Sequence, residues 1–427
     1  MSDNQLFITE VRIKKLRHLL NIDIQMSDKE RKHLLITGKN GSGKTSLLLA
    51  MKDYLLGIEN NQVNNLPTMK SNIELWKKNI LDTEKRLGQI PSDQKIPLLN
   101  NIKTFKNAIN SQQPILDKYN ETITISFSDS LTLYDDYING SFIISIFDAK
   151  RATTLNIPKG ITKINLKQRY QISEKAGVDF IQYIVNLKAD RSFARDEKDD
   201  SSVLEIDNWF EIFENSLKEI FSDQTLKLEF DRKNYNFELL TAGHEKTDLN
   251  HLSDGYSAIL NIITELILRM ESKSSKTYNL QGIVLIDEIE THLHIELQKK
   301  ILPFLIKFFP NIQFIVTTHS PFVISSIENA IVFDLEKKYK VEDMTGYSID
   351  AIIESYFDSD KYSEELKKKV ERLEYLILKS EKNQTEITEI TDLKKYFSEI
   401  PKFNSPELVL KLQQLDLSNL SKNDKFN

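Results

Sequence analysis

The sequence predicts an α/β fold with a mostly parallel sheet, an antiparallel β subdomain and a short helical-hairpin insertion. Two stretches predict the sheet. The apolar run HLLIT at residues 33–37 leads into a glycine-rich loop and an apolar helix, and residues 252–323 alternate helix and apolar strand. Apolar strands separated by helices are typical of parallel sheets covered on both faces. A polar stretch of two helix lengths, residues 60–119, predicts the insertion.

The composition is that of a globular protein. Of 427 residues, 40% are hydrophobic and 28% are charged, which excludes disorder or a collagen-like structure for the chain as a whole. No stretch reaches the roughly 18 to 20 apolar residues of a membrane span, so we expect neither secretion nor membrane insertion. The absence of cysteine excludes disulfides, thiolate zinc sites and cysteine nucleophiles. It also fits a reducing compartment, so we expect a cytoplasmic protein.

The remaining strands and helices follow from periodicity along the chain. Alternating apolar residues predict two N-terminal strands, and the helix after the glycine-rich loop is expected from Thr45 to about Leu56. Strands are predicted next, then two helices, then a hairpin of two strands, in the order 122–127, 141–148, 178–194, 208–221 and 226–241. The C-terminal region is charged and helical in pattern. One apolar stripe there predicts core or dimer packing and consists of Leu366, Val370, Leu373, Leu376 and Ile377.

Two segments have alternative interpretations. The insertion forms either a lid or docking lever, or a packed helical pair with no special role. Its arms of about 20 residues would extend about 30 Å, too short for a long coiled coil. The segment 149–173 contains six basic residues and no acidic one, in a chain of net charge −6. It is either a patch for nucleic-acid phosphates or a solvated loop. Its basic residues are Lys150, Arg151, Lys159, Lys163, Lys167 and Arg169.

The glycine-rich loop is a phosphate-binding motif. GKNGSGKT matches G-x-x-x-x-G-K-[ST] and lies between an apolar strand and an apolar helix, which is the context this motif requires. Glycines let backbone amides wrap the phosphates, Lys44 reaches the β and γ phosphates, and the Thr45 hydroxyl binds Mg²⁺. The predicted cofactors are therefore ATP and Mg²⁺. The residues expected to bind nucleotide are Gly38, Asn40, Gly41, Ser42, Gly43, Lys44, Thr45 and Ser46.

A second apolar strand, GIVLI at residues 282–286, ends in two carboxylates. A buried parallel strand would deliver them to the same edge of the sheet as the glycine-rich loop. Asp287 is expected to hold the Mg²⁺ shell. Glu288 is expected to orient or deprotonate the attacking water, because ATP hydrolysis needs a carboxylate beside the γ phosphate.

Two further segments complete the predicted site. Ser253 and Gly255 lie at the start of an apolar helix, where a hydroxyl and backbone amides suit a γ phosphate, although a simple helix cap is the alternative. The strand IQFIVTT leads into His319-Ser320-Pro321. This placement resembles that of the switch histidine of ABC-type ATPases, and the resemblance implies that His319 contacts the γ phosphate. The predicted catalytic residues are Lys44, Glu288 and His319. The long separation between Lys44 and Asp287 does not fit a compact AAA+ or small-GTPase core.

The motifs GKNGSGKT, LSDGYSAIL, IVLIDEIETHLH and IVTTHSPF together resemble the OLD-like, RecF/SMC-related ATPases, including the ATPase subunits of Septu-type anti-phage systems. The resemblance implies an ABC/SMC-type head with a P-loop NTPase fold, LSDGY as its signature motif and Asp287-Glu288 as Walker B. It covers about half of the chain. Asp254 and Tyr256 depart from the transporter form of the signature. Neither Gln168 nor Gln182 can be assigned as the Q-loop glutamine.

The resemblance also implies a domain organisation. Residues 1–58 and 246–335 would form the two halves of the head, 59–120 the helical insertion, 121–245 a β/α insertion with the basic loop, and 336–427 a C-terminal helical region. OLD nucleases carry a TOPRIM domain after the switch histidine. Here only Asp358-Ser359-Asp360 has the required spacing, in a helical context, and no histidine follows His319. We therefore expect any nuclease to be another polypeptide. For His292 and His294 we weigh metal ligation against a dimer interface, and the missing third ligand favours the interface.

The implied function is an ATP-driven switch. One head grips ATP, and Ser253 and Gly255 of a second copy close over the γ phosphate, giving a homodimer or a higher homo-oligomer. The expected partner is an effector protein, a nuclease or toxin, in anti-phage defence, with possible DNA or other nucleic-acid binding through the basic loop. The alternatives are a RecF/SMC-type repair or recombination ATPase and an ATP-bound scaffold with little turnover. A transporter subunit fits least, because no membrane component is indicated.

Overall fold

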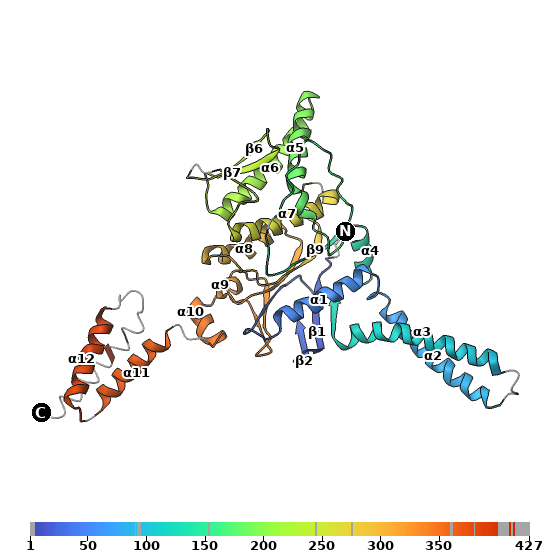
Figure 1. Cartoon of the computed structure of the whole chain (residues 1–427), viewed down its shortest axis with the longest axis horizontal. Helices are drawn as coiled ribbons and strands as arrows, with labels where there is room; N and C mark the ends of the chain where they lie inside the picture. The colour runs from blue at the N-terminus through green and yellow to red at the C-terminus, as the bar shows by residue number, and fades with distance from the viewer. Residues whose placement is uncertain are drawn as a thin grey trace. The chain divides into compact units, whose positions relative to one another are not determined.

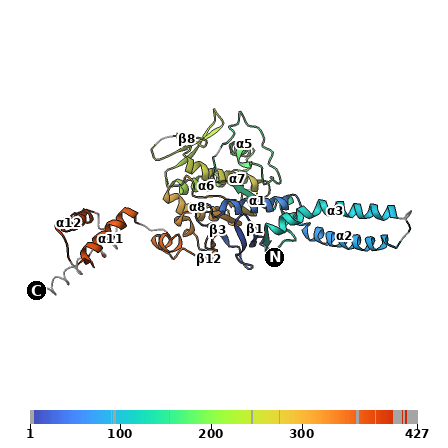
Figure 2. The same ribbon diagram turned by 60° about the horizontal axis from the view of Figure 1, so that its bottom comes forward.

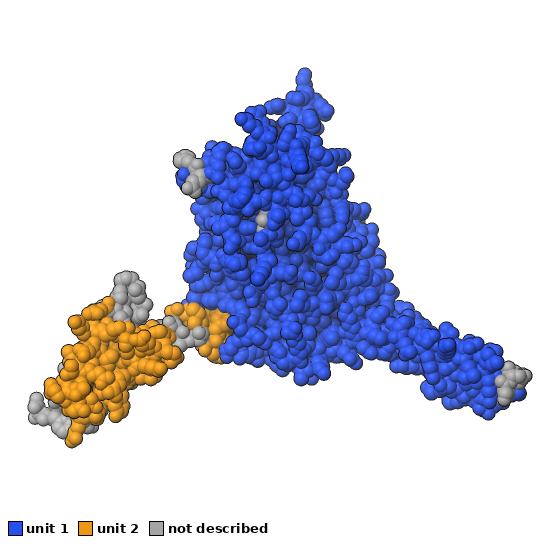
Figure 3. Space-filling model, viewed as in Figure 1, with its two compact units in different colours: residues 1–349 blue, residues 350–427 orange. Residues whose placement is uncertain are grey.

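A computed structural model describes residues 5–399 except 90, 92–94, 153, 244–245, 275, 359–361 and 380, together with 410, 413 and 414. The chain divides into two compact units, residues 1–349 and residues 350–427 (Figure 3). The division into five segments expected from the sequence is finer than this and stays a prediction. Among the described residues, no helix is long and apolar enough to cross a membrane.

The larger unit is built on a six-stranded sheet in the order β12-β11-β3-β10-β9-β5, in which β12 is the antiparallel strand. The strands are β3 (His33–Thr37), β5 (Phe142–Phe147), β9 (Gln281–Ile286), β10 (Ile312–Thr317), β11 (Ala330–Asp334) and β12 (Tyr339–Glu342). Every residue of β3, β10 and β11 is buried, as expected of apolar strands in a parallel sheet. The predicted mostly parallel core is therefore confirmed.

An antiparallel sheet lies beside this core. Its order is β2-β1-β4, formed by β1 (Ile8–Leu16), β2 (Leu19–Gln25) and β4 (Ile123–Phe127). Helix α1 (Lys44–Glu59) shares one hydrophobic core with this sheet and with the parallel strands, through residues such as Leu47, Met51 and Leu55. The glycine-rich loop is thus fixed between two sheets. The short helix α4 (Leu133–Ile138) leads into β5.

The helical insertion forms the expected hairpin. Helices α2 (Leu66–Leu87) and α3 (Lys95–Glu121) lie side by side and extend from the larger unit (Figures 1 and 2). The second arm is longer than predicted and contains Pro114. Few of its residues are buried, namely Ile102, Leu116 and Tyr119. The hairpin therefore exposes most of both arms, as its polar composition requires.

Helices α5 (Phe180–Asp196) and α6 (Asp200–Phe221) precede a second antiparallel sheet, β6-β7-β8. Its strands are β6 (Lys227–Asp231), β7 (Asn236–Leu240) and β8 (Lys246–Asp248). The predicted hairpin in residues 226–241 is confirmed by the pairing of β6 with β7. Next come α7 (Asp254–Ser274), α8 (Ile295–Phe308) and α9 (Pro321–Ile324), which alternate with β9 and β10 as predicted.

The smaller unit contains helices α11 (Glu364–Leu378) and α12 (Gln384–Glu399). They follow the short helix α10 (Ile349–Ala351) and a π-helix (Ile352–Tyr356). Val370, Leu373 and Ile377 of the predicted stripe pack with Phe397 of α12 in a separate hydrophobic cluster. The stripe is therefore core packing within this unit. Asp358-Ser359-Asp360 lies partly outside the described residues.

His33 on β3 gives the fold a pH dependence. Its ring is buried and its Nδ1 accepts a hydrogen bond from the Phe314 amide at 3.1 Å. Burial and the nearby Arg31 and Lys32 lower the pKa of His33 to about 3. As the pH falls below about 6.5, the unfolded chain binds a proton that the folded chain does not bind, so stability decreases. We expect a loss of about 2 kcal/mol at pH 5 from this residue.

Urea unfolding at pH 7.5 and pH 5 measures this effect. In His33→Gln, whose amide oxygen can also accept the Phe314 hydrogen bond, we expect the stability loss between the two pH values to shrink by about that amount. His251→Gln is the matched control, because the side chain of His251 is 79% exposed. Equal losses in His33→Gln and wild type would contradict the assignment.

Candidate functional site

The glycine-rich loop between β3 and α1 has the backbone that phosphate binding requires. Gly38, Gly41 and Gly43 have φ values of 132°, 84° and 101°, which residues with a side chain rarely adopt. A Cβ on Gly43 would also lie 3.0 Å from Leu19 Cδ1. The loop therefore turns tightly into the first amides of α1, where the helix dipole favours an anion.

Lys44 and Thr45 open α1 at this loop. The buried Lys44 ammonium donates hydrogen bonds to the carbonyls of Gly38 at 2.8 Å and of Lys39 at 3.3 Å. Burial lowers the pKa of Lys44, while the nearby carboxylates of Glu288, Glu290, Asp287 and Asp334 act in the opposite direction. The ammonium thus lies inside the loop that would receive phosphate, near four carboxylates of opposite charge.

Asp287 and Thr45 supply oxygen donors at the end of β9. The Thr45 hydroxyl donates to Asp287 Oδ1 at 3.4 Å, and the Thr317 hydroxyl donates to the same oxygen at 2.5 Å. A hydroxyl and a carboxylate at this separation are the ligand types that Mg²⁺ prefers. The donor set therefore fits the expected Mg²⁺ ion. Among the described residues, no group of three or more histidine, aspartate or glutamate side chains forms a separate metal site.

Glu288 has a strained backbone conformation. Its φ is 44°, in the left-handed region that residues other than glycine seldom adopt. Its amide donates to Thr317 Oγ1 at 2.8 Å, and its Oε2 accepts from the Thr291 hydroxyl at 3.3 Å. Strain of this kind persists only where the surroundings hold the residue in place, and it is concentrated at functional sites.

Arg151 holds this turn, whereas the sequence pattern predicted it only as one basic residue of a phosphate-binding patch. Its guanidinium donates to the carbonyls of three consecutive residues, Asp287 at 2.7 Å, Glu288 at 3.2 Å and Ile289 at 3.1 Å. It also donates to the Asp148 carbonyl at 3.1 Å. Burial lowers the pKa of Arg151 to about 10, against the opposing effect of Glu290, Asp287 and Glu288. Arg151 therefore stays charged at neutral pH and fixes the backbone on both sides of Glu288.

One cavity of about 300 Å³ joins the P-loop with the ends of β9 and β10. It is lined by Arg17, His18, Asn40, Gly41, Gly43, Lys44, Thr45, Ser46, Glu288 and His319. Two further predicted site residues contact the lining. The Gly38 carbonyl accepts a hydrogen bond from Lys44, and Asp287 Oδ1 accepts one from Thr45. Ser42 lies in the same loop, and its carbonyl is 3.1 Å from His18 Nε2. The structure thus brings most of the predicted site residues together around one cavity.

His319 follows the end of β10 and lines the cavity. Its amide donates to Glu290 Oε1 at 2.5 Å, which ties the histidine to the turn after β9. Burial and the nearby Lys44 ammonium lower the pKa of His319, while Glu290 and Glu288 raise it. The ring is therefore neutral at physiological pH and has both a donor and an acceptor nitrogen.

Arg17 and His18 were not predicted. They occupy the turn between β1 and β2, and Arg17 has a φ of 53°. This turn reaches the P-loop only because the antiparallel sheet lies beside α1. The sequence signal was a basic pair at the tip of a predicted hairpin, which is common on exposed turns.

Ser253 and Gly255 do not line this cavity. Ser253 is exposed just before α7, and Gly255 is buried against the turn after β9, where an added Cβ would lie 2.8 Å from the His292 carbonyl. Tyr256 stacks on Phe221 of α6 with ring centroids 3.9 Å apart. The start of α7 is therefore positioned by contacts within the chain, and Ser253 beside it is exposed.

The basic loop differs from the prediction at Arg151. That side chain is buried in the contacts described above, so it cannot contact a nucleic acid. Arg169 lies 3.5 Å from Glu59 and over the Tyr137 ring, and Lys167 pairs with Glu174. The remaining basic side chains of the loop are exposed, namely Lys150, Lys159 and Lys163. The predicted patch is therefore smaller than its composition indicates.

Two other sets of candidates have local roles. Gln168 and Gln182 donate to the carbonyls of Asn139 and Gly160, and neither lines the cavity. His294 caps α8, because its Nδ1 accepts from the Leu297 amide at 3.4 Å. His292 has a φ of 66° and forms part of the turn after β9.

Known proteins resemble this chain over parts of its length. Septu protein PtuA of Bacillus mycoides (strain KBAB4) is 33% identical over 117 residues, which cover 26% of this chain and 16% of that protein. Retron Ec83 probable ATPase of Escherichia coli is 38% identical over 124 residues, 26% of this chain and 23% of that protein. Septu protein PtuA of Bacillus thuringiensis is 24% identical over 237 residues, 52% of this chain and 56% of that protein. Each match covers less than two thirds of the relative, and together they confirm the resemblance to Septu-type ATPase subunits.

Solved structures show a weaker likeness. The SMC head bound to the C-winged helix domain of ScpA is 14% identical, with coverage of 78% of this chain and 96% of that chain and a TM-score of 0.35. The SMC head domain from Thermotoga maritima is 13% identical, with coverage of 77% and 94% and a TM-score of 0.32.

The central part of the chain identifies its family. The family model described as "AAA domain, putative AbiEii toxin, Type IV TA system" matches residues 34–325. This range begins in β3 and ends just after α9, so it includes the P-loop, Asp287, Glu288 and His319. Since the match spans more than half of the 427 residues, the chain belongs to this AAA-domain family.

Proposed function

We propose that this chain is an ABC-type ATPase that binds ATP with Mg²⁺ and hydrolyses it. The observation that carries this proposal is the single cavity lined by Lys44, Thr45, Glu288 and His319. These residues come from distant parts of the sequence, and each has the chemistry that phosphoryl transfer to water requires. Membership of the AAA-domain family supports the same activity.

Each residue has a distinct role in the reaction. The P-loop amides and Lys44 bind the phosphates, and His319 donates a hydrogen bond to the γ phosphate from one ring nitrogen. Glu288 accepts a proton from the attacking water as the new bond from oxygen to the γ phosphorus forms. The bond from the γ phosphorus to the bridging oxygen breaks, which releases ADP and phosphate. Thr45 and Asp287 would hold Mg²⁺, which neutralises phosphate charge when bound.

The position of Ser253 leads to the proposal of a head dimer. Ser253 is exposed and lies outside the cavity of its own chain. A hydroxyl at the N-terminus of the long helix α7 is suited to bind the γ phosphate of a second copy. ATP would then join two heads, and its hydrolysis would let them separate.

The biological role follows from the relatives. Their names refer to Septu proteins and to a retron ATPase, so we infer that this chain acts as the ATP-driven switch of a bacterial anti-phage system. The effector that it controls would be a separate protein, a nuclease or toxin. A cytoplasmic location agrees with the absence of cysteine.

Lys44→Ala tests ATP hydrolysis directly. We expect its steady-state rate to fall about 10²- to 10³-fold, because the variant loses a charged donor to the phosphates. Lys39→Ala is the matched control. Lys39 lies in the same loop, but its side chain is 69% exposed and pairs with Glu336 at 3.1 Å. We expect the control to hydrolyse ATP at the wild-type rate.

Two results would contradict the proposal. If wild type hydrolyses no ATP, alone or with DNA, the chain is an ATP-bound scaffold and not a motor. If Lys44→Ala hydrolyses ATP as fast as Lys39→Ala, the measured activity does not arise at this cavity.

A further inference from the structure

An apolar groove lies at the base of the helical hairpin and shares no lining residue with the ATP cavity. Its volume is about 630 Å³, and its lining comes from the connection between α1 and α2, from β4 and from the segment 130–135. Leu66, Phe127 and Leu133 are among the lining residues. Leu131 also lines the groove, and 89% of its surface is exposed. Apolar side chains of a partner would remove this surface from water.

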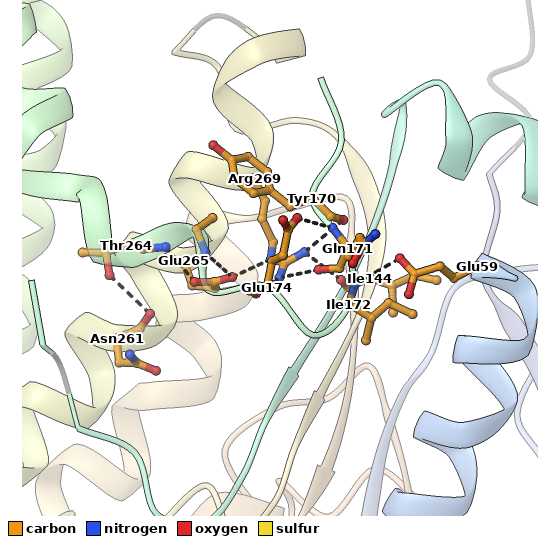
Figure 4. A network of polar contacts seen from close by, with 12 residues as sticks. Glu59, Ile144, Tyr170, Gln171, Ile172, Glu174, Asn261, Thr264, Glu265 and Arg269 are labelled. Atoms are coloured by element: carbon orange, nitrogen blue, oxygen red, sulfur yellow. Dashed lines mark hydrogen bonds and ion pairs between the residues drawn. The ribbon is translucent and has the colours of Figure 1, made fainter. Parts of the chain in front are cut away.

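Contacts within the chain fix the walls of this groove. Tyr54 of α1 lines the groove and donates a hydrogen bond to the Ile125 carbonyl of β4 at 3.3 Å. Glu59, at the end of α1, accepts a hydrogen bond from the Tyr137 hydroxyl of α4 at 2.5 Å. Glu59 also accepts from the Ile172 amide at 3.3 Å (Figure 4). Because these contacts hold the groove in shape, a partner does not have to order it on binding.

The groove lies in an acidic part of the chain. Residues 121–140, which include β4 and α4, contain four acidic residues and no basic one. Among the residues that line the groove, Asp135 is the charged one, and it is exposed. The surface that complements this groove therefore combines apolar side chains with positive charge.

The far half of the helical hairpin, residues 77–106, has this combination. It contains seven basic and three acidic residues, although the whole chain has a net charge of −6. From residue 94 to residue 116, which includes most of α3, there is no acidic residue. The charge of this half of the hairpin is therefore opposite to that of the groove.

One face of α3 carries both apolar and basic side chains. Ile96 and Leu99 are three residues apart, and they are 65% and 52% exposed. Side chains three or four residues apart are neighbours on the surface of a helix. By the same spacing, Leu99 shares its face of α3 with three lysines, namely Lys95, Lys103 and Lys106.

The hairpin cannot reach the groove of its own chain. Leu66 and Pro67, at the start of α2, line the groove. Helix α2 has 22 residues and is about 33 Å long, so the far half of the hairpin is carried away from its own base. Figure 2 shows α2 and α3 extending together from the larger unit. The face of α3 that contains Leu99 is therefore presented to other molecules.

We propose that the far half of the hairpin of one copy docks into the groove of a second copy of this chain. Ile96 and Leu99 enter the groove beside Leu131, and the lysines of the same face lie near Asp135. Two different surfaces meet, so the contact is heterologous, and repetition of it closes a ring or extends an open assembly. The contact involves neither ATP nor the ATP cavity, and it therefore goes beyond the proposed head dimer.

Sedimentation velocity of the full chain without nucleotide tests this contact. We expect wild type to form species larger than the monomer as its concentration rises, and salt to weaken their formation. Leu99→Glu and Leu131→Lys are each expected to weaken the association at least tenfold. Each variant loses the burial of a leucine and places a charge against like charges of the partner surface. Both leucines are exposed, and circular dichroism melting checks that the variants are folded.

The two variants mixed together give the sharpest result. Leu99→Glu retains an intact groove, and Leu131→Lys retains an intact hairpin. We therefore expect their equimolar mixture to form pairs, although neither variant associates alone at the same concentration. The matched controls are Leu75→Glu on α2 and Leu204→Lys on α6, because these leucines are 53% and 61% exposed and lie outside both surfaces. Both controls are expected to associate as wild type does.

Three results would overturn the proposal: wild type that stays monomeric up to its solubility limit, a mixture that stays monomeric, or controls that weaken association as much as the test variants. The proposed ATPase is tested separately. Lys44 lies outside the groove, so Lys44→Ala is expected to associate as wild type does without nucleotide, even though it no longer hydrolyses ATP. Loss of association in Lys44→Ala would place the contact at the heads and refute the hairpin contact.

Discussion

Glu288→Gln is expected to hydrolyse ATP about 10²- to 10⁴-fold more slowly than wild type and still to bind it. The amide cannot accept the proton of the attacking water, but it has nearly the same shape as the carboxylate. The Thr291 hydroxyl can still donate to its oxygen, and the backbone contacts of residue 288 are unchanged. Single-turnover hydrolysis and equilibrium ATP binding measure the two quantities separately.

The same variant tests the head dimer. Slow hydrolysis should let the ATP-bound dimer accumulate, so size-exclusion chromatography with ATP and Mg²⁺ is expected to show a species of twice the mass. Glu336→Gln is the control, because Glu336 is an exposed partner of Lys39 and lies outside the cavity. Wild-type turnover by Glu288→Gln would show that another group activates the water. A slow variant that stays monomeric with ATP would refute the nucleotide-joined dimer while leaving the hydrolytic role of Glu288 intact.

Arg151→Ala is expected to reduce both stability and turnover. The variant leaves the carbonyls of Asp287, Glu288 and Ile289 without their buried donor, and we expect the free energy of unfolding to fall by about 3 to 5 kcal/mol. Because Glu288 has a strained φ of 44°, its turn should relax once the guanidinium is absent. Urea unfolding measures the stability, and Lys159→Ala is the control on the exposed part of the same loop.

Kinetics separate a positioning role from a merely structural one. If Arg151 positions Glu288, then kcat should fall in Arg151→Ala at a temperature where the variant is folded, while the KM for ATP changes little, because the P-loop contacts are intact. Arg151→Lys should recover part of the stability and little of kcat, since one ammonium cannot span the same carbonyls as a guanidinium. Equal loss of ATP binding and of kcat would indicate general unfolding of the site instead.

The sequence determined the chemistry of the phosphate site, because that chemistry depends on short contiguous patterns. The glycines of the P-loop, Lys44 and Thr45 follow one another in the chain, and their φ values require glycine whatever the rest of the fold does. The apolar strand before Asp287 is likewise a local signal, since a strand buried on both faces must be apolar along its whole length. The parallel core and the helical hairpin could be predicted for the same reason.

Only the tertiary structure decided which residues support that site. Arg151 appeared as one of six basic residues in a loop, and its sequence neighbours give no sign that it crosses to the turn after β9. Arg17 and His18 reach the P-loop because the β1-β2 hairpin packs beside α1. Burial and hydrogen bonding between distant segments depend on packing, and charge or polarity in a sequence does not reveal whether packing covers it.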